Sequence, residues 1–207
     1  MNAAGIVLAA GRSVRMGRDK LALPLQDGTS LASRVLQAAA ASRLDPILVI
    51  GRSELPPSWL QMASGGSGAA ERIRYIACPH ADKGMAYSLK CGIQAVAALQ
   101  SDAAVILLAD QPLVASQHIN ALLEHFEANQ QVDYVAASDQ GTAKPPVLLA
   151  SGFFSKLRSL EGDQGAGALI NRPSSAGIGV PLPSHIFLDA DTPEDLNLIM
   201  KKEAEGI

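Results

Sequence analysis

Short apolar runs alternate along the chain with longer stretches in which apolar residues recur at a helical period. The apolar runs predict strands at Gly5–Ala10, Pro46–Ile50, Ile73–Cys78, Ala103–Ala109, Val132–Ala137, Pro146–Leu149 and Ile186–Leu188. The amphipathic stretches predict helices at Ser30–Ser42, Gly84–Leu99, Ala115–Ala128 and Pro193–Glu203, with a shorter one within Gly152–Leu160. Such alternation is typical of parallel strands that are buried on both faces and crossed over by helices. We therefore expect an α/β fold, with one doubly wound, mostly parallel sheet in a single domain spanning residues 1–207.

Composition removes several classes of protein. Of the 207 residues, 48% are apolar and 18% are charged, which excludes intrinsic disorder. A net charge of -3 argues against nucleic acid as a partner, since such binding needs an excess of Lys and Arg. The longest apolar run, Ala103–Ala109, is too short to span a membrane. Cys78 and Cys91 form no C-x-x-C pair, and reduced thiols with a cytoplasmic location are expected.

A dense basic segment follows the first predicted strand. Arg12, Arg15, Arg18 and Lys20 place four cations within nine positions of an otherwise acidic chain, next to Gly11 and Gly17. Glycines that expose backbone N–H groups, together with Arg and Lys, can bind a polyphosphate. The glycine motifs of P-loop ATPases and of dinucleotide-binding proteins are both absent. Composition alone leaves a solvated basic loop as an equal alternative.

The same segment carries a family resemblance. Leu8 to Ser13, then Arg15-Met16-Gly17 and Lys20, resemble the L-A-A-G-x-S-x-R-M-G-x-x-K opening of the MobA-like nucleotidyltransferases, especially the molybdenum cofactor cytidylyltransferases. Five further motifs follow in the same order, which are G-M-x-x-S-L at 84–89, D-Q-P at 110–112, P-V-L at 146–148, G-D-x-G-A at 162–166 and D-x-D-T-P at 189–193. The resemblance therefore covers residues 7 to about 195.

The resemblance implies a Rossmann-like sheet of the nucleotide-diphospho-sugar transferase type, and transfer of a nucleoside monophosphate from a triphosphate with release of pyrophosphate. Lys20 and Arg15 suit catalytic contacts with the triphosphate, because they stabilise negative charge that spreads during transfer. Nucleotide binding is expected from Leu8, Ala9, Ala10, Gly11, Arg12, Ser13 and Ser88. Arg12 and Arg18 are equally well explained as solvated neighbours, and Ser88 as an ordinary residue at a helix start.

Carboxylates follow two of the predicted strands. Asp110 comes directly after Ala103–Ala109, and Asp189 directly after Ile186–Leu188. Carboxylate oxygens at such strand ends suit Mg²⁺, which protein sites hold with one or two carboxylates plus substrate phosphates. We therefore expect Asp110 and Asp189 as Mg²⁺ ligands, although Asp110 could instead start a turn. Asp191 remains open, and Asp195 is assigned to a helix-capping T-x-x-D pattern that begins at Thr192.

The acceptor and the base are less closely defined. The resemblance implies acceptor contacts in the region of Asp163 and Lys144, but this chain has Gly167 where relatives often have Arg, and Lys144-Pro145-Pro146 where they usually have a glycine. Ala9-Ala10-Gly11 matches the cytidine-using relatives, whereas L-A-G-G accompanies guanosine, so CTP is expected. The acceptor is then the phosphate of molybdopterin or of its molybdenum form, and a molybdenum hydroxylase such as xanthine dehydrogenase is a possible client.

Two alternatives stay open. The chain could transfer a nucleotide to a sugar phosphate or polyol phosphate. It could also be a non-catalytic maturation factor that carries the cofactor to a molybdenum hydroxylase. Lys20 and Asp110 together argue against a mere carrier, because a carrier needs neither stabilisation of a leaving group nor Mg²⁺.

Overall fold

The computed structural model describes residues 1–11, 19–63 and 69–205. Within these ranges seven strands form one sheet in the order β3-β2-β1-β4-β6-β5-β7. The strands are β1 (Ala3–Leu8), β2 (Ile47–Gly51), β3 (Ile73–Ala77), β4 (Ala103–Leu108), β5 (Tyr134–Asp139), β6 (Thr142–Ala150) and β7 (Gly177–Pro181). Strand β6 is antiparallel to β4 and β5, and the other neighbours are parallel. The expected α/β fold with a mostly parallel sheet is confirmed.

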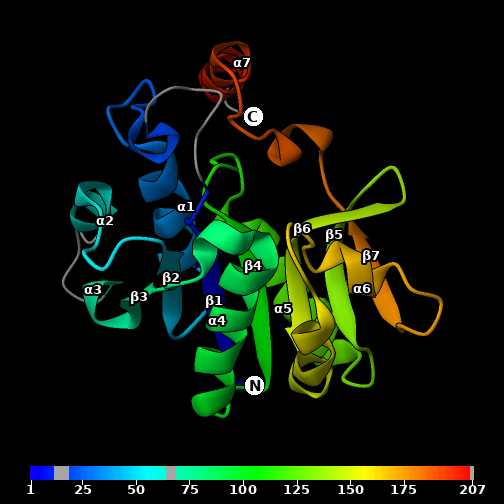
Figure 1. Ribbon diagram of the computed structural model, residues 1–207. Helices are drawn as coiled ribbons and strands as arrows, with labels where there is room; N and C mark the ends of the chain where they lie inside the picture. Colours follow the sequence, from blue (N-terminus) through cyan, green and yellow to red (C-terminus); the bar gives the residue numbers. More distant parts are fainter. Residues whose placement is uncertain (12–18, 64–68, 206–207) are drawn as a thin grey trace.

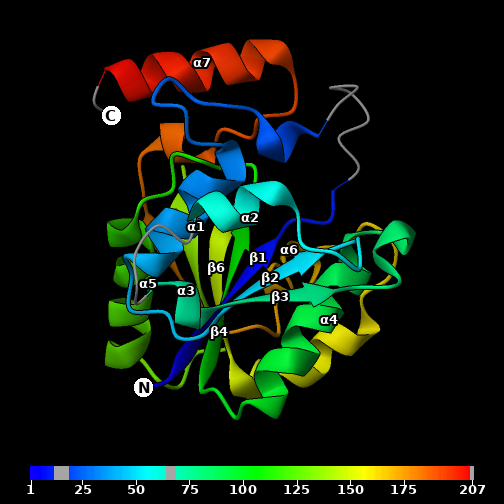
Figure 2. The ribbon, with the colours of Figure 1, turned by 90° about the vertical axis from the view of Figure 1, so that its left-hand side faces the viewer.

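Helices cover both faces of the sheet (Figures 1 and 2). The α-helices are α1 (Leu31–Ala40), α2 (Ser58–Ala63), α3 (Ala69–Arg72), α4 (Met85–Ala98), α5 (Ser116–Ala128), α6 (Gly167–Ile170) and α7 (Pro193–Ala204). Short 3-10 helices are η2 (Lys20–Ala22), η3 (Ala81–Lys83), η4 (Ser151–Ser159) and η5 (Ser184–Phe187). In Figure 2, α1 and α5 lie on one side of the sheet and α4 on the other. The short helix that the sequence suggested within Gly152–Leu160 is the 3-10 helix η4.

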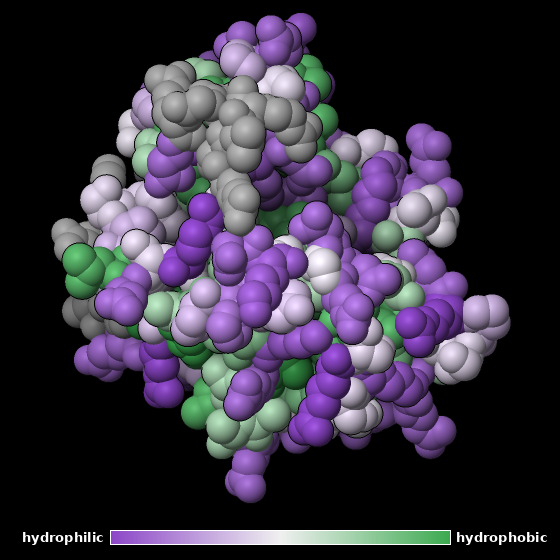
Figure 3. Space-filling view, viewed as in Figure 1, coloured by the Kyte–Doolittle hydropathy of each residue, from purple (hydrophilic) through white to green (hydrophobic). Residues whose placement is uncertain are grey.

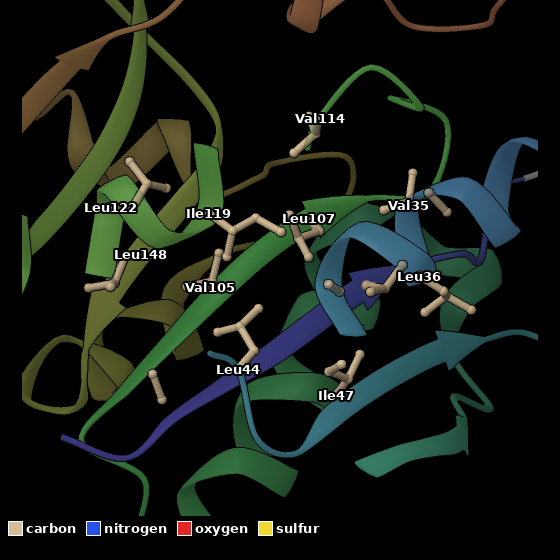
Figure 4. Packing of buried hydrophobic residues seen from close by; sticks show 14 of the residues in the cluster. Val35, Leu36, Leu44, Ile47, Val105, Leu107, Val114, Ile119, Leu122 and Leu148 are labelled. Atoms are coloured by element: carbon tan, nitrogen blue, oxygen red, sulfur yellow. The ribbon is translucent and has the colours of Figure 1, made fainter. Parts of the chain in front are cut away.

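The central strands β1, β2 and β4 read as continuous apolar runs because they are buried on both faces. Val7 and Val105 pack with α1 and α5, and Ile6 and Ile106 pack with α4 on the opposite face. Figure 4 shows the first of these clusters, where Val35 and Leu36 of α1 and Ile119 of α5 approach the strands. A strand with two apolar faces cannot show the alternation of a half-exposed strand, which explains the pattern seen in the sequence.

Strands β1 and β4 bring distant segments to one edge of the sheet. Their residues pair in parallel from Ala3 with Ala103 to Leu8 with Leu108, so the chain leaves both strands at the same level. Helix α7 lies beyond this edge, at the end of the molecule away from the N-terminus (Figure 1). There Ile199 packs with Leu23, Leu25 and Leu31, which follow η2. The chain segments after β1, after β4 and before α7 therefore meet at one place.

The final part of the sheet differs from the sequence prediction. Residues 186–188 form no strand, because η5 covers Ser184–Phe187 and Ile186 packs into a small core cluster instead. The seventh strand is β7, whose sequence GIGVP has low β-propensity. Parallel pairing with β5 forms this strand, and the ring of Tyr134 covers Gly177 where a side chain would otherwise stand. The prediction of a strand at Ile186–Leu188 is wrong, since a tertiary contact outweighs local propensity.

The surface shown in Figure 3 is mainly hydrophilic, with apolar side chains in small groups. Leu55 is the most exposed large apolar residue of the described chain, at 78% of its full exposure. None of the described helices is both long enough and apolar enough to cross a membrane.

Candidate active site

An ion cluster stands where β1 and β4 end. The Nζ of Lys20 donates to Oδ2 of Asp110 at 2.6 Å and to Oδ1 of Asp191 at 2.7 Å. Lys20 is only 8% exposed and is the first residue of the 3-10 helix η2. Leu21 packs with Val7 and Val35 in the core, and the Asp19 side chain accepts a hydrogen bond from the Leu21 N–H. The buried Leu21 thus fixes the backbone of η2, and from this backbone the Lys20 side chain extends to the two carboxylates.

A backbone contact joins the two acidic segments. The Ala190 N–H donates to the carbonyl of Asp110 at 3.1 Å, which holds the 189–191 turn against the end of β4. The side chain of Gln111, itself 4% exposed, hydrogen-bonds to the carboxylate of Asp189. The Lys20 ammonium thus bridges Asp110 and Asp191, and Asp189 lies near enough to both acids to feel their charge. Asp110 and Asp189, the two positions proposed from the sequence as metal ligands, therefore belong to the same cluster.

The charges in this cluster perturb one another. Burial alone would lower the pKa of Lys20, but the carboxylates of Asp110 and Asp191 outweigh burial and raise its pKa. For Asp189, burial raises the pKa first. The negative charge of Asp110 adds to this, and that of Asp191 adds further, against the lowering effects of the Gln111 hydrogen bond and the Lys20 charge. Among the described residues of this cluster, three acids and one cation leave an excess of negative charge.

This donor set fits a divalent cation. Asp110 and Asp191 already direct one carboxylate oxygen each toward a common cation, and Gln111 has a buried amide oxygen with no hydrogen-bond partner in the described part of the chain. Among the described residues, no group of three or more acidic, His or Cys side chains forms a complete metal site by itself. Two protein carboxylates completed by substrate phosphates are what Mg²⁺ commonly uses. The sequence left open whether Asp191 is a metal ligand. The structure places its carboxylate beside that of Asp110, on the same ammonium.

The described part of the first loop begins inside the sheet. The Ala9 N–H donates to the carbonyl of Ile50 at 2.9 Å, and the carbonyl of Leu8 accepts from the Ala109 N–H at 3.2 Å. Ala10 is buried, and its carbonyl accepts a hydrogen bond from Nη2 of Arg52 at 2.7 Å. Sequence reasoning missed Arg52, although its place directly after β2 was the available indication. Leu8, Ala9 and Ala10 thus lie at the ends of β1 and β4, near the ion cluster. Arg12, Ser13 and Arg15 lie outside the described residues.

Helix α4 begins at the same edge. Its Gly92 approaches β1 and β2 so closely that a Cβ there would lie 2.7 Å from Cγ2 of Ile6. Ser88 is buried and stands one turn earlier on the same face, nearer the carboxyl ends of those strands. This position agrees with a role for Ser88 near the nucleotide, and the described structure also agrees with a Ser that simply packs at the start of a helix.

Two of the motif loops are locked together at the start of α4. Gly84 has φ of 119°, and a Cβ at this position would overlap the carbonyl oxygen of Gly162 and lie 2.8 Å from Oδ1 of Asp163. The Ala86 N–H donates to the Gly162 carbonyl at 3.0 Å. The loop that carries Asp163 therefore packs directly on the helix that carries Ser88.

Lys144 lies in a separate cluster. Its Nζ donates to Oδ2 of Asp139 at 2.7 Å and stands 5.2 Å from the ring centre of Phe187. The Ser184 hydroxyl donates to the other oxygen of the same carboxylate. The hydrogen bonds from Lys144 and Ser184 lower the pKa of Asp139. These contacts give Lys144 a structural partner on β5, and a role toward the acceptor stays a hypothesis.

The cap of α7 is as the sequence indicated. The Thr192 hydroxyl accepts from the Asp195 N–H at 3.2 Å, and the Asp195 carboxylate accepts from the Thr192 N–H at 2.9 Å. Asp195 is thus engaged in capping the helix, with Pro193 in its first turn. The cap fixes the chain direction immediately after Asp191.

Comparison with known proteins places this arrangement in a family. The sequence model of the MobA-like NTP transferase domain matches residues 5–176. The chain is 35% identical over 201 residues to the purine catabolism protein PucB of Bacillus subtilis, covering 95% of each chain. It is 27% identical over 207 residues to a probable molybdenum cofactor guanylyltransferase of Mycobacterium avium, covering 99% of this chain and 98% of that one.

Solved structures agree on the fold. The crystal structure of Rv0371c from Mycobacterium tuberculosis superposes with a TM-score of 0.79 at 22% identity, covering 97% of this chain and 98% of that one. A second structure of Rv0371c, in complex with manganese, gives a TM-score of 0.73 at 20% identity over 97% of this chain and 99% of that one. At these identities the likeness concerns the fold. With the family match over most of its length, the chain belongs to the MobA-like NTP transferase family and is a nucleotidyltransferase of that kind.

Proposed function

We propose that this nucleotidyltransferase transfers CMP from CTP to the terminal phosphate of molybdopterin, or of its molybdenum form, with release of pyrophosphate. The observation that carries the proposal is the contact of Lys20 with Asp110 and Asp191, at the point where β1 and β4 end. One ammonium and several carboxylates at the carboxyl edge of a mostly parallel sheet are what transfer from a metal-bound triphosphate requires.

The reaction defines what each group must do. An oxygen of the acceptor phosphate attacks the α-phosphorus of CTP, the bond from that phosphorus to the bridging oxygen breaks, and pyrophosphate leaves with the electron pair. Lys20 stabilises the negative charge that grows on the phosphate oxygens, and Arg15 is the second proposed triphosphate contact. When bound by Asp110 and a second carboxylate, Asp191 or Asp189, Mg²⁺ or Mn²⁺ supplies charge neutralisation at the phosphates. The fixed loops from Leu8 to Gly11 and around Ser88 orient the nucleotide.

Cytidine is supported by the first loop. Ala9-Ala10-Gly11 has the form that accompanies cytidine in the resembling enzymes, and the Ala10 methyl is buried against the end of β1. Guanosine is the competing base, because the Mycobacterium avium relative is named a guanylyltransferase. That relative is less similar to this chain than PucB, whose name does not state a base.

The names of the relatives support the acceptor. One is named for molybdenum cofactor chemistry and the other for purine catabolism. Both subjects meet in a molybdenum hydroxylase of purine breakdown, such as xanthine dehydrogenase, which is the client we propose. Lys144 and Asp163 remain the proposed acceptor contacts, with Asp163 held against α4 through the Gly84–Gly162 contact.

The proposal is tested by product formation. Purified protein is incubated with Mg²⁺ or Mn²⁺, with molybdopterin, and with CTP, GTP or ATP in turn, and pyrophosphate is measured. Many turnovers with CTP and molybdopterin are expected. Faster release with GTP would contradict the base, and labelled CTP transferred only to sugar or polyol phosphates would contradict the acceptor. Binding without turnover would favour a carrier.

A further inference from the structure

The ammonium of Lys20 stands where a metal ion would have to bind. Its Nζ touches Oδ2 of Asp110 and Oδ1 of Asp191 simultaneously, at 2.6 and 2.7 Å. The Lys20 side chain is 10% exposed, whereas those of Asp110 and Asp191 are 22% and 34% exposed. Lys20 is thus the most buried of these three side chains, and each carboxylate is more exposed to solvent than the ammonium that it contacts.

A divalent cation and this ammonium exclude each other. Mg²⁺ binds carboxylate oxygens at about 2.0–2.1 Å, and at the same two oxygens it would approach the Lys20 Nζ with no screening water between them. Like charges at that separation repel strongly in a partly buried site. Lys20 has a flexible four-carbon stem, so its ammonium can move away while its backbone stays fixed by the buried Leu21.

We propose that Lys20 is the built-in competitor of the metal. Without nucleotide, its ammonium neutralises Asp110 and Asp191 and keeps divalent cations from binding there. A triphosphate offers the ammonium other anionic partners, so the carboxylates are released to the metal when the nucleotide arrives. The metal therefore loads with the nucleotide and binds weakly to the nucleotide-free protein. This inference rests on the proposed function of the same residues.

The negative charge of the cluster determines how strongly the Lys20 ammonium weakens metal binding. Asp189 stands near Asp110 and Asp191 and adds its negative charge to theirs, and removal of Lys20 takes away the ammonium that contacts two of these acids. A unit charge within about 4–6 Å changes a carboxylate's proton affinity by roughly 1–3 pKa units. A comparable effect on a metal ion predicts that loss of the Lys20 charge tightens metal binding by at least about tenfold.

The experiment measures Mn²⁺ binding rather than activity. Free Mn²⁺ is titrated by electron paramagnetic resonance against the nucleotide-free wild type and Lys20→Met, and against both with CTP. Lys20→Met is expected to bind Mn²⁺ at least tenfold more tightly than the wild type without nucleotide. Lys20→Arg, which keeps the charge, should stay close to the wild type. Lys156→Met is the matched control, because it removes a lysine paired with Asp133 at the opposite edge of the sheet.

The outcomes separate the two proposals. Equal or weaker Mn²⁺ binding by nucleotide-free Lys20→Met overturns the competitor role, while wild type with CTP that binds more Mn²⁺ than the same CTP alone still supports the proposed function. Wild type with CTP that binds no more Mn²⁺ than CTP alone overturns both. Lys20→Gln keeps hydrogen-bond donors for the carboxylates without the charge, and it provides the same comparison if Lys20→Met does not fold.

Discussion

The Lys20 ammonium and the Asp110 carboxylate lie 2.6 Å apart, although they are separated by 90 positions in the chain. The parallel pairing of β1 with β4 produces this contact, since both strands reach the same sheet edge at Leu8 and Leu108. Lys20 lies in the 3-10 helix η2 and Asp110 lies just after β4, and neither local structure depends on the contact between them. Their meeting is a property of the sheet topology, and the proposed chemistry depends on it.

Loss of the Lys20 ammonium should impair turnover more than folding. If Lys20 stabilises charge mainly in the transition state, Lys20→Ala lowers kcat by about 10²- to 10³-fold, the usual effect of one electrostatic donor. Initial rates of pyrophosphate release measure this. The Lys156→Ala variant loses a lysine that is ion-paired to Asp133 at the amino end of β5, and it should keep normal turnover. Normal turnover in Lys20→Ala would remove Lys20 from the catalytic machinery.

Neutralising one acid should change the metal requirement. Asp110→Asn keeps the side-chain shape and removes one charge, so half-maximal activity should require much more Mg²⁺ if this carboxylate is a ligand. The same titration with Asp189→Asn and Asp191→Asn decides between the two acids. The direct contact of Asp191 with Lys20 leads us to expect the larger shift there. An unchanged titration for Asp110→Asn would leave it a turn-forming residue.

Features of the fold and of the candidate site could be predicted from the sequence where the interacting residues are close together in the chain. The first five strands were predicted correctly to within about two residues. The clearest were β1, β2 and β4, because strands buried on both faces form unbroken apolar runs. Local chemistry was also readable, as in the Thr192–Asp195 cap. Asp191 and Arg52 were not resolved, because their partners Lys20 and Ala10 lie 171 and 42 positions away in the chain. Strand β7 was missed because Tyr134 and the pairing with β5 create it, rather than its own residues.

The Gly84–Gly162 contact should tolerate no side chain. In Gly84→Ala the methyl would overlap the Gly162 carbonyl at a φ of 119°, which L-residues rarely adopt. A strained backbone of this kind costs about 1–3 kcal/mol. The free energy of unfolding in urea should fall by that amount, and turnover should fall as well, because Ser88 and Asp163 are carried by the displaced segments. Gly152→Ala is the matched control, since nothing lies within 4 Å of its added Cβ.

Stability should decline in mild acid because of His118. Burial lowers the pKa of His118 below its ordinary value of 6.5, and the charge of His185 lowers it further. Below about pH 6.5 the unfolded chain takes up a proton that the folded chain resists, so stability falls until the pH passes the lower, folded pKa. In addition, Nδ1 of His118 accepts from the Ala115 N–H only while unprotonated.

Urea unfolding at pH 7.5 and at pH 5.5 measures this contribution. His118→Asn should reduce the difference between the two pH values, because the titrating group is gone. His125→Asn changes an exposed histidine on the same helix and should leave the difference in place. An equal loss of stability in wild type and His118→Asn would show that other groups cause the acid sensitivity.

The choice of base is most sharply tested at Ala10. Its carbonyl is fixed by Arg52 and its methyl is buried, so Ala10→Gly removes the methyl and widens the allowed backbone dihedrals at the start of the loop. If this loop contributes to the selection of cytosine, the CTP to GTP ratio of kcat/KM should fall. One pocket contact is typically worth about 1–3 kcal/mol, or roughly 10- to 200-fold in discrimination, so the loss should be measurable but incomplete.

Arg52→Lys should shift the ratio in the same direction, because an ammonium is a poor replacement for a guanidinium that positions the Ala10 carbonyl. A wild type that prefers GTP, or an Ala10→Gly ratio equal to that of the wild type, would show that this loop does not select cytosine, even if Lys20 and Asp110 keep their roles in transfer.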